Sequence, residues 1–195
     1  LNNFEAFKLI YDKLNCNIDD ESILALACEY KNEFIVKKIM EQKKVNTEYP
    51  GGSHNEIPLY YIIKNNDVNL LKILMDNEHF NINSKFNENH NAITLCVNKK
   101  SFKVLDFLLE NKKLNVTIDN HKLLHSLFMD PENLLKILRN DKIIITNREE
   151  FIFTCFKNMT NFDENMIEIF KNMNFNSKNC NGENILFWTY NNLQY

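Results

Sequence analysis

The sequence predicts an all-α repeat protein, a solenoid of stacked antiparallel helix pairs. Three observations indicate it: an apolar phrase that recurs six times, a nearly constant interval between its copies, and polar turn residues between paired apolar stripes. The phrases begin at positions 6, 35, 70, 104, 134 and 166, so the intervals are 29, 35, 34, 30 and 32 residues. A period of about 33 residues is typical of helical-repeat arrays.

Each phrase begins with a pair of branched or bulky apolar residues. A lysine or an acidic residue usually follows the pair, and two or three more apolar residues come after it. The six copies are 6–10, 35–39, 70–74, 104–108, 134–138 and 166–170. In an array of this kind, each helix pair contacts mainly its neighbours. Such an array is expected to form an extended surface that binds another macromolecule, and to have no single catalytic cleft.

The stretch 57–83 shows the clearest unit. Pro58 suits the first turn of a helix, because it has no donor N–H and a fixed φ. Asn65 and Asn66 end this helix, and Asp67 is a natural N-cap for the next. The first helix has the stripe Leu59, Ile62 and Ile63, and the second has Leu70, Leu71, Ile73 and Leu74. Since helices this short are marginal alone in water, neighbouring pairs are expected to bury these stripes against one another.

Composition narrows the functional classes. The chain has 195 residues, a formal net charge of −3 and a pI of about 6.0, which argues against a general nucleic-acid binder. No apolar run approaches the length of a membrane span, and no signal peptide is visible. The five cysteines are odd in number and form no Cys-x-x-Cys pair, so we expect a reducing cytoplasm, with the nucleus as an alternative.

Asparagine occurs 34 times, whereas glycine and proline occur three times each. Turns that need a positive φ must therefore often use asparagine, the next most tolerant residue.

Because the chain begins with Leu1 and its C-terminal end is rich in apolar residues, we also expect that it is a piece of a longer protein or that its end docks on another chain.

The repeats resemble ankyrin repeats. Residues 57–60, Ile-Pro-Leu-Tyr, are similar to the Thr-Pro-Leu-His start of the family's first helix. Residues 26–28, Leu-Ala-Cys, with Asn32 and the run 35–37, Ile-Val-Lys, resemble its helix-turn-helix run, and 181–187 resembles the opening of a further unit. The resemblance covers essentially the whole chain. No unit has an intact Thr-Pro-Leu-His, and asparagine or lysine mostly replaces the glycine between paired helices, so we expect irregular stacking around 120–165.

The resemblance implies one ankyrin-repeat domain over 1–195, with about five full repeats and a half repeat at each end. The expected half repeats are 1–18 and 179–195, and the full repeats are about 19–52, 53–87, 88–117, 118–147 and 148–178. The helix caps support this placement: Asp130 and Pro131 suit an N-cap and first position, and Ser101 can cap the helix after it.

The resemblance also implies a protein–protein interaction module that binds its partner on a concave face of finger loops and exposed first-helix positions. The candidate contact residues are Glu29, Tyr30, His54, Glu56, Lys64, Asn65, Lys85, Asn87, His90, Asn98 and Lys99. An alternative is a regulatory or recruitment domain of a larger enzyme, channel or ubiquitin-ligase adaptor. We expect no nucleic-acid partner, no membrane insertion and no small-molecule substrate.

Signals of catalysis or of metal binding are weak. His121 and His125 are four residues apart, a spacing compatible with a metal, but no third ligand is near in sequence. The pair Gly51-Gly52 lies where a finger loop is expected and lacks the lysine of a phosphate loop. Cys28 is expected to be a small buried apolar residue. We therefore expect no enzyme activity, no catalytic residue, no metal and no cofactor.

Overall fold

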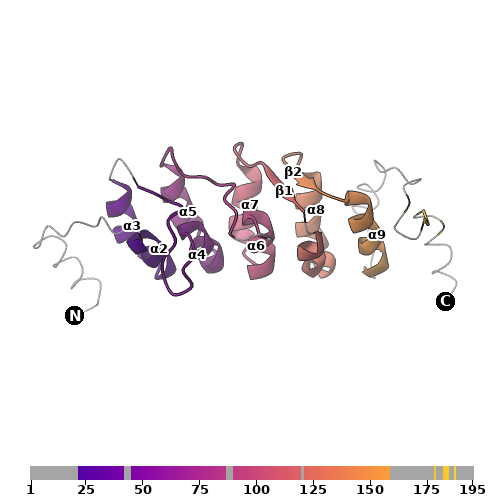
Figure 1. Cartoon of the computed structure of the whole chain (residues 1–195), viewed down its shortest axis with the longest axis horizontal. Helices are drawn as coiled ribbons and strands as arrows, with labels where there is room; N and C mark the ends of the chain where they lie inside the picture. The colour runs from indigo at the N-terminus through magenta and orange to yellow at the C-terminus, as the bar shows by residue number, and fades with distance from the viewer. Residues whose placement is uncertain are drawn as a thin grey trace, which may run out of the picture. The chain divides into compact units, whose positions relative to one another are not determined.

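The computed structural model describes residues 22–41, 45–86, 90–119 and 121–158, together with 178, 182–184 and 187. Their helices and strands are drawn in Figure 1. These residues belong to two compact units. The first unit lies within Leu1–Asn65 and Asn69–Asn81, and the second within Asn66–Val68 and Ile82–Tyr195. The apolar phrases predicted at 6–10 and 166–170 lie outside the described residues.

The first unit contains two helix pairs. Helix α2 (Ser22–Glu29) is followed by α3 (Glu33–Met40), and α4 (Pro58–Asn65) is followed by α5 (Val68–Met75), which belongs to this unit from Asn69. Helix α3 begins after Asn32, whose side chain accepts a hydrogen bond from the Ile35 amide at 3.2 Å. Helix α2 packs against its pair partner α3 and also against α4 of the following pair. Consecutive pairs in this unit are therefore joined through their first helices.

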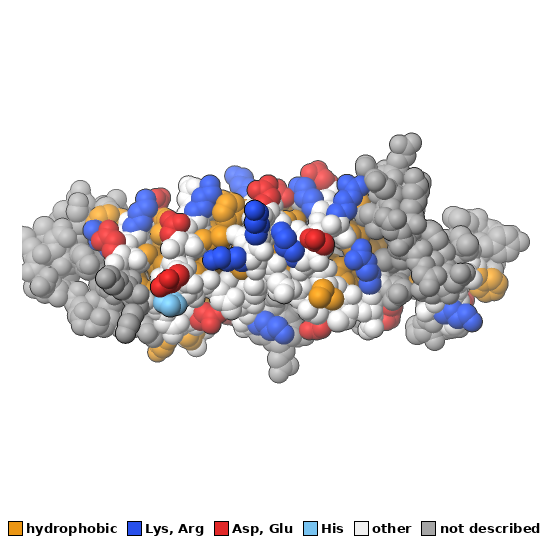
Figure 2. Space-filling view, turned by 90° about the horizontal axis from the view of Figure 1, so that it is seen from above, with side chains coloured by type: hydrophobic (Ala, Val, Ile, Leu, Met, Phe, Trp, Pro, Cys, Tyr) orange, Lys and Arg blue, Asp and Glu red, His pale blue; other side chains and the backbone are white. Residues whose placement is uncertain are grey.

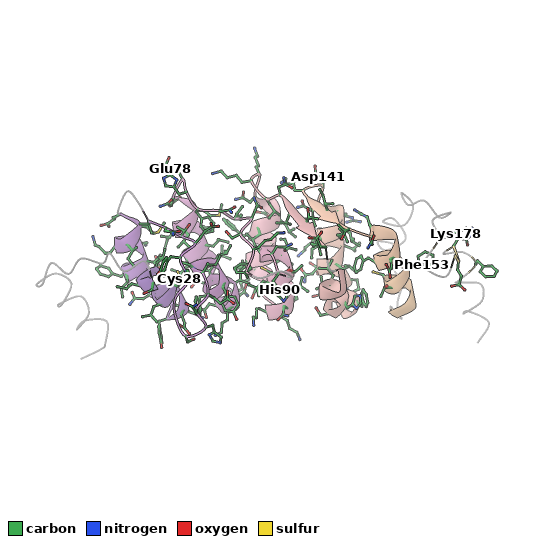
Figure 3. The ribbon with its side chains drawn as sticks, viewed as in Figure 1. Cys28, Glu78, His90, Asp141, Phe153 and Lys178 are labelled. Atoms are coloured by element: carbon green, nitrogen blue, oxygen red, sulfur yellow. The ribbon has the colours of Figure 1, made fainter. Side chains whose placement is uncertain are left out.

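The predicted apolar stripes form the core of the first unit. Its most deeply buried side chains, at most 1% exposed, include Leu24, Cys28, Val36, Leu59, Tyr61, Ile62, Ile63, Leu70, Leu71 and Leu74. Ile73, which was also assigned to the stripe, is only half-buried. Cys28 lies within the helical layer, whereas Glu78 lies in the loop after α5 (Figure 3). The stripe residues predicted in α4 and α5 are therefore confirmed as core, with Ile73 at its margin.

The second unit continues the same arrangement of paired helices. Helix α6 (Ala92–Lys99) is followed by α7 (Phe102–Glu110), η1 (His121–Met129) by α8 (Pro131–Arg139), and α9 (Arg148–Asn158) comes last. The first helices α6, η1 and α9 contact one another in that order. Figure 1 shows α6 beside α7 and η1 beside α8, as their contacts require. Most helix starts agree with the sequence, but Ser101 makes no side-chain capping hydrogen bond to α7, contrary to the expectation.

Two short strands are a departure from the all-helical prediction. Strand β1 (Val116–Ile118) pairs in parallel with β2 (Ile143–Ile145), with Val116 opposite Ile143. Both strands bury their first and third residues and expose the middle one. Their residues are β-branched, which favours this extended backbone. Each strand follows the second helix of its pair, so the sheet links consecutive repeats and leaves the helical stacking unchanged.

The irregularity expected in 120–165 is seen at the start of this stretch. The first helix of the pair, η1, is a 3-10 helix of nine residues, where the other first helices are α-helical. The 3-10 form has a poorer hydrogen-bond geometry and is uncommon at this length. The following helix α8 is regular, with Asp130 as N-cap and Pro131 at its first turn, as predicted.

The stacking account gives a direct test in α5. Leu71 is fully buried, so Leu71→Ala should lower the free energy of unfolding by roughly 2–5 kcal/mol, measured by urea denaturation. The neighbouring Lys72 is exposed, and Lys72→Ala should change the same quantity by less than about 0.5 kcal/mol. Equal effects of the two substitutions would show that the Leu71 side chain is not part of the core.

Candidate partner-binding surface

A tight finger turn precedes α4 in the first unit. Gly51 and Glu56 form an antiparallel bridge with two backbone hydrogen bonds of 3.0 Å. Gly52 and Asn55 have φ values of 69° and 51°, so the turn between them is left-handed at both ends. A Cβ on Gly51 would lie 2.6 Å from the Ser22 carbonyl oxygen, and one on Gly52 would lie 2.6 Å from the Tyr61 hydroxyl. The only Gly-Gly pair of the chain is therefore needed for the fold of this finger.

Glu29, at the end of α2, braces this finger turn. Its Oε2 accepts a hydrogen bond from the Ser53 amide at 2.8 Å, and its Oε1 accepts one from the Ser53 hydroxyl. The Ser53 hydroxyl also contacts Nδ1 of His54 at 2.7 Å. The hydrogen bonds from Ser53, hydroxyl first and amide second, hold the pKa of Glu29 below its ordinary value, with smaller contributions from the charges of Lys64 and His54. Glu29, a predicted contact residue, thus has its carboxylate bonded within the chain, and its contact with a partner stays a prediction.

Two further side chains tie the finger and the helices together. The buried Tyr61 hydroxyl donates to the Gly51 carbonyl at 2.7 Å and accepts from the His54 amide at 2.9 Å. The side-chain amide of Asn65 donates to the carbonyls of Cys28 and Glu29 at 3.0 Å each. Asn65, a predicted contact residue, thus joins the end of α4 to the end of α2, and its contact with a partner stays a prediction. The finger is thus held rigidly on the first helices.

Three predicted contact residues of the first unit are exposed. Tyr30 is 74% exposed, and His54 and Lys64 are exposed as well. The Lys64 ammonium lies 6.0 Å from the centroid of the Tyr61 ring. Leu26, on α2, is 44% exposed and was not among the predicted contact residues. The amide of Tyr30, the first residue after α2, donates to the Leu26 carbonyl at 3.1 Å, so these two exposed residues are one helical turn apart.

The second unit has an equivalent finger before α6. Lys85 and Asn91 form an antiparallel bridge, and the Phe86 amide donates to the His90 carbonyl at 3.0 Å. Lys85 is exposed and His90 is half-buried, while the predicted contact Asn87 lies outside the described residues. Burial, and then the charge of Lys99, lower the pKa of His90. His90 lies at the start of α6 (Figure 3).

The end of α6 completes the candidate residues. Asn98 and Lys99 are exposed, as is Lys100 immediately after the helix. Asn91 begins the helix with a capping box, in which its side chain accepts from the Thr94 amide and Thr94 accepts from the Asn91 amide. Glu56 of the first unit contributes its backbone to the Gly51 bridge and is half-buried. Among the predicted residues that the structure describes, three are braces that bond within the chain (Glu29, Glu56 and Asn65), and His90 is half-buried. The others have exposed side chains: Tyr30, His54, Lys64, Lys85, Asn98 and Lys99.

Sequence reasoning missed Ser53, Tyr61 and Leu26. Ser53 directly follows the glycine pair, and this position was the only feature of the sequence that could have indicated its role in the finger turn. Tyr61 was not assigned to the stripe of Leu59, Ile62 and Ile63, and its hydroxyl partner Gly51 is ten residues away in the sequence. Leu26 belongs to the run 26–28 that carries the family resemblance, but its exposure depends on how α2 packs.

Within the described ranges, no group of three or more His, Cys, Asp or Glu residues is placed to hold a metal ion. The His125 ring stacks on Phe128, with 4.9 Å between ring centroids. Cys28, Cys96 and Cys155 are buried free thiols, and burial raises the pKa of Cys155 to about 12. None of the helices in these ranges is long and hydrophobic enough to span a bilayer.

Paired short helices that stack through their first members, with a finger turn before them, define a helical-repeat protein. Residues 24–120 match the family model for ankyrin repeats, in three copies, so this segment consists of ankyrin repeats. The matched segment overlaps the predicted repeats 19–52, 53–87 and 88–117, whose individual bounds stay a prediction. Neither the comparison with curated proteins nor that with solved structures found a match. The full count of five repeats and two half repeats stays a prediction.

The brace at Glu29 has a measurable titration. Ser53→Ala removes the hydroxyl hydrogen bond, the largest cause of the lowered pKa, so the pKa of Glu29 should rise toward its ordinary value in an NMR titration. A depressed carboxylate pKa stabilises the fold above the unfolded-state pKa, and this contribution is lost as the pH falls through the folded-state pKa. Ser53→Ala should therefore reduce the loss of stability in that acidic range.

The control for this titration is Ser126→Ala, at an exposed serine of the second unit. It should leave the titration of Glu29 unchanged. If Ser53→Ala also leaves that titration unchanged, the hydroxyl does not hold the carboxylate.

Proposed function

We propose that this chain is a protein-binding module whose contact surface consists of the finger turns and the exposed ends of the first helices. Ankyrin repeats are generally protein–protein interaction modules, and the family is typically non-enzymatic. The observation that carries the proposal is Tyr30, which is 74% exposed beside a finger that Glu29 and Tyr61 brace. Aromatic side chains presented on a rigid support are frequent energetic centres of interfaces.

The braces support this proposal energetically. Ordering a flexible loop on binding lowers affinity, so a finger that is already fixed avoids much of that loss. Hydrogen bonds fix the finger and the helix ends. The bonds from the Ser53 amide, the Tyr61 hydroxyl and the Asn65 side-chain amide are 2.7–3.0 Å long, and the Ser53 hydroxyl adds another. The fold therefore does not depend on the side chains of Tyr30 and Lys64, so substitutions there should change partner recognition and leave the fold intact.

The same contact surface would serve a free-standing binder or a recruitment domain of a larger protein. We propose that the chain has no catalytic activity and that its partner is a protein, with no nucleic acid or small-molecule substrate. We also propose the cytoplasm as its compartment, with the nucleus as an alternative, because Cys28, Cys96 and Cys155 are free buried thiols.

The test uses the full chain as bait for affinity capture, followed by mass spectrometry and by affinity measurement with the purified partner. Tyr30→Ala should weaken binding by about fivefold or more, which corresponds to roughly 1 kcal/mol. Lys64→Ala and Lys99→Ala should each weaken it by a smaller factor, without lowering the thermal midpoint. Matched controls are Lys72→Ala and Lys103→Ala, at exposed positions of the second helices. Wild-type binding by all three test variants would refute the assigned surface.

A further inference from the structure

An open groove lies between the second helices α7 and α8 of the second unit. Its volume is about 460 Å³, and it is lined by Asp106, Leu109, Glu110 and Lys136. The first three residues belong to α7, and Lys136 reaches from α8 to Asp106. Hollows of this size are typical of ligand sites in proteins. None of the lining residues belongs to a finger turn or to a first helix, so the groove is distinct from the surface proposed above.

Lys136 already has a full set of hydrogen-bond acceptors. Its Nζ lies 2.9 Å from Asp106 Oδ1, 3.2 Å from Glu132 Oε1 and 3.5 Å from Asn133 Oδ1. The hydrogen bond to Asp106 raises the pKa of Lys136 most, burial lowers it by less, and the bond to Glu132 raises it further. Because a lysine ammonium has three donors, this side chain keeps none for a ligand. It acts as a cation that the chain supplies to its own groove.

The unused hydrogen-bonding capacity of the groove consists of carboxylate oxygens. Glu110 is exposed, and its carboxylate forms no hydrogen bond or ion pair within the described ranges. Asp106 accepts from Lys136 through Oδ1, and among the residues that the structure describes no donor is bonded to its Oδ2. With Glu132 beside them, three carboxylates stand against the single ammonium of Lys136. The groove can therefore accept hydrogen bonds from a ligand but cannot donate them through these side chains.

Leu109 gives the groove an apolar wall. Its side chain is half-buried, and its carbonyl oxygen accepts a hydrogen bond at 2.9 Å from the side chain of Asn140, just after α8. Arginine and lysine combine a cationic end with an aliphatic stem, so they can contact both an apolar wall and carboxylates. Figure 2 shows a face of the chain on which acidic and basic side chains are mixed, so a cation must be selected by a local excess of carboxylates.

We propose that this groove binds an arginine of a basic segment of a protein partner, with Glu110 and Asp106 as the carboxylates that hold the guanidinium. A guanidinium has five donors in a planar fork, which matches carboxylate oxygens, and its charge strengthens these hydrogen bonds. A lysine would supply fewer directed donors, and an anion would meet acceptors only. The inference goes beyond the proposed function, because it assigns a second contact surface, on the second helices.

The test selects random peptides displayed on phage against the full chain and discards those that also bind the double variant Asp106→Asn, Glu110→Gln. We expect the remaining peptides to be enriched in arginine. Their affinity, measured by fluorescence anisotropy, should fall between about 50 mM and about 500 mM salt. Glu110→Gln alone should weaken them by about two- to fivefold, the effect of one exposed ion pair. The matched control is Glu150→Gln, at an exposed acid of α9, which should leave the affinity unchanged.

A substitution of Lys136 separates a binding groove from an ion pair that only joins two helices. Lys136→Gln removes the chain's own cation and leaves Asp106 and Glu132 without it, so the arginine peptides should bind about two- to fivefold more tightly. The fold should persist, because exposed ion pairs contribute little to stability. If the ion pair only joins α7 to α8, the same substitution should lower the thermal midpoint and leave the peptide affinity unchanged.

Several results would overturn the inference. One is that no peptide remains after the double variant has been used to discard the others, or that those remaining have no arginine. Another is unchanged or weaker binding of the arginine peptides to Lys136→Gln. Peptides that lose affinity with Tyr30→Ala and keep it with Glu110→Gln would also overturn the inference, but they would leave the proposed function standing.

Discussion

The mutual burial of short helices is the constraint on which this protein depends. The α-helices α2 to α8 have only eight or nine residues each, too few for stability in isolation. Their stability must come from packing, and α2 illustrates this because it contacts both α3 and α4. In the second unit, η1 likewise contacts α6, α8 and α9. Consecutive pairs are therefore structural partners within each unit.

Asparagine supplies a second set of links between neighbouring repeats. Asn83 donates to the Lys113 carbonyl at 3.0 Å and accepts from the Asn115 amide at 2.8 Å. Asn140 donates to the Leu109 carbonyl at 2.9 Å, across 31 residues. Because the amide side chain both donates and accepts, it can satisfy backbone groups at loop and helix ends that would otherwise lack partners. Abundant asparagine in a glycine-poor chain thus has a structural use.

The helical core could be predicted from sequence because it depends on local periodicity. Leu71 and Cys28 are buried as their repeat positions indicate, and asparagine occupies the left-handed turns at Asn55, Asn66 and Asn147. Strand β2 could not be foreseen, because a run of three isoleucines is equally suited to a buried helix. The role of Glu29 was missed, since its partner Ser53 lies 24 residues away. The hydrogen bonds made by Glu29 and Asn65 therefore required the three-dimensional structure, and the partner-binding surface itself stays a prediction.

The central claim is that a helix pair does not fold without its neighbours. Circular dichroism of a synthetic peptide spanning residues 57–83, which contains α4 and α5, tests it most directly. We expect the isolated peptide to be largely unstructured in water, with no cooperative thermal transition. A helical spectrum that melts cooperatively would contradict the account, because the pair would then be stable by itself.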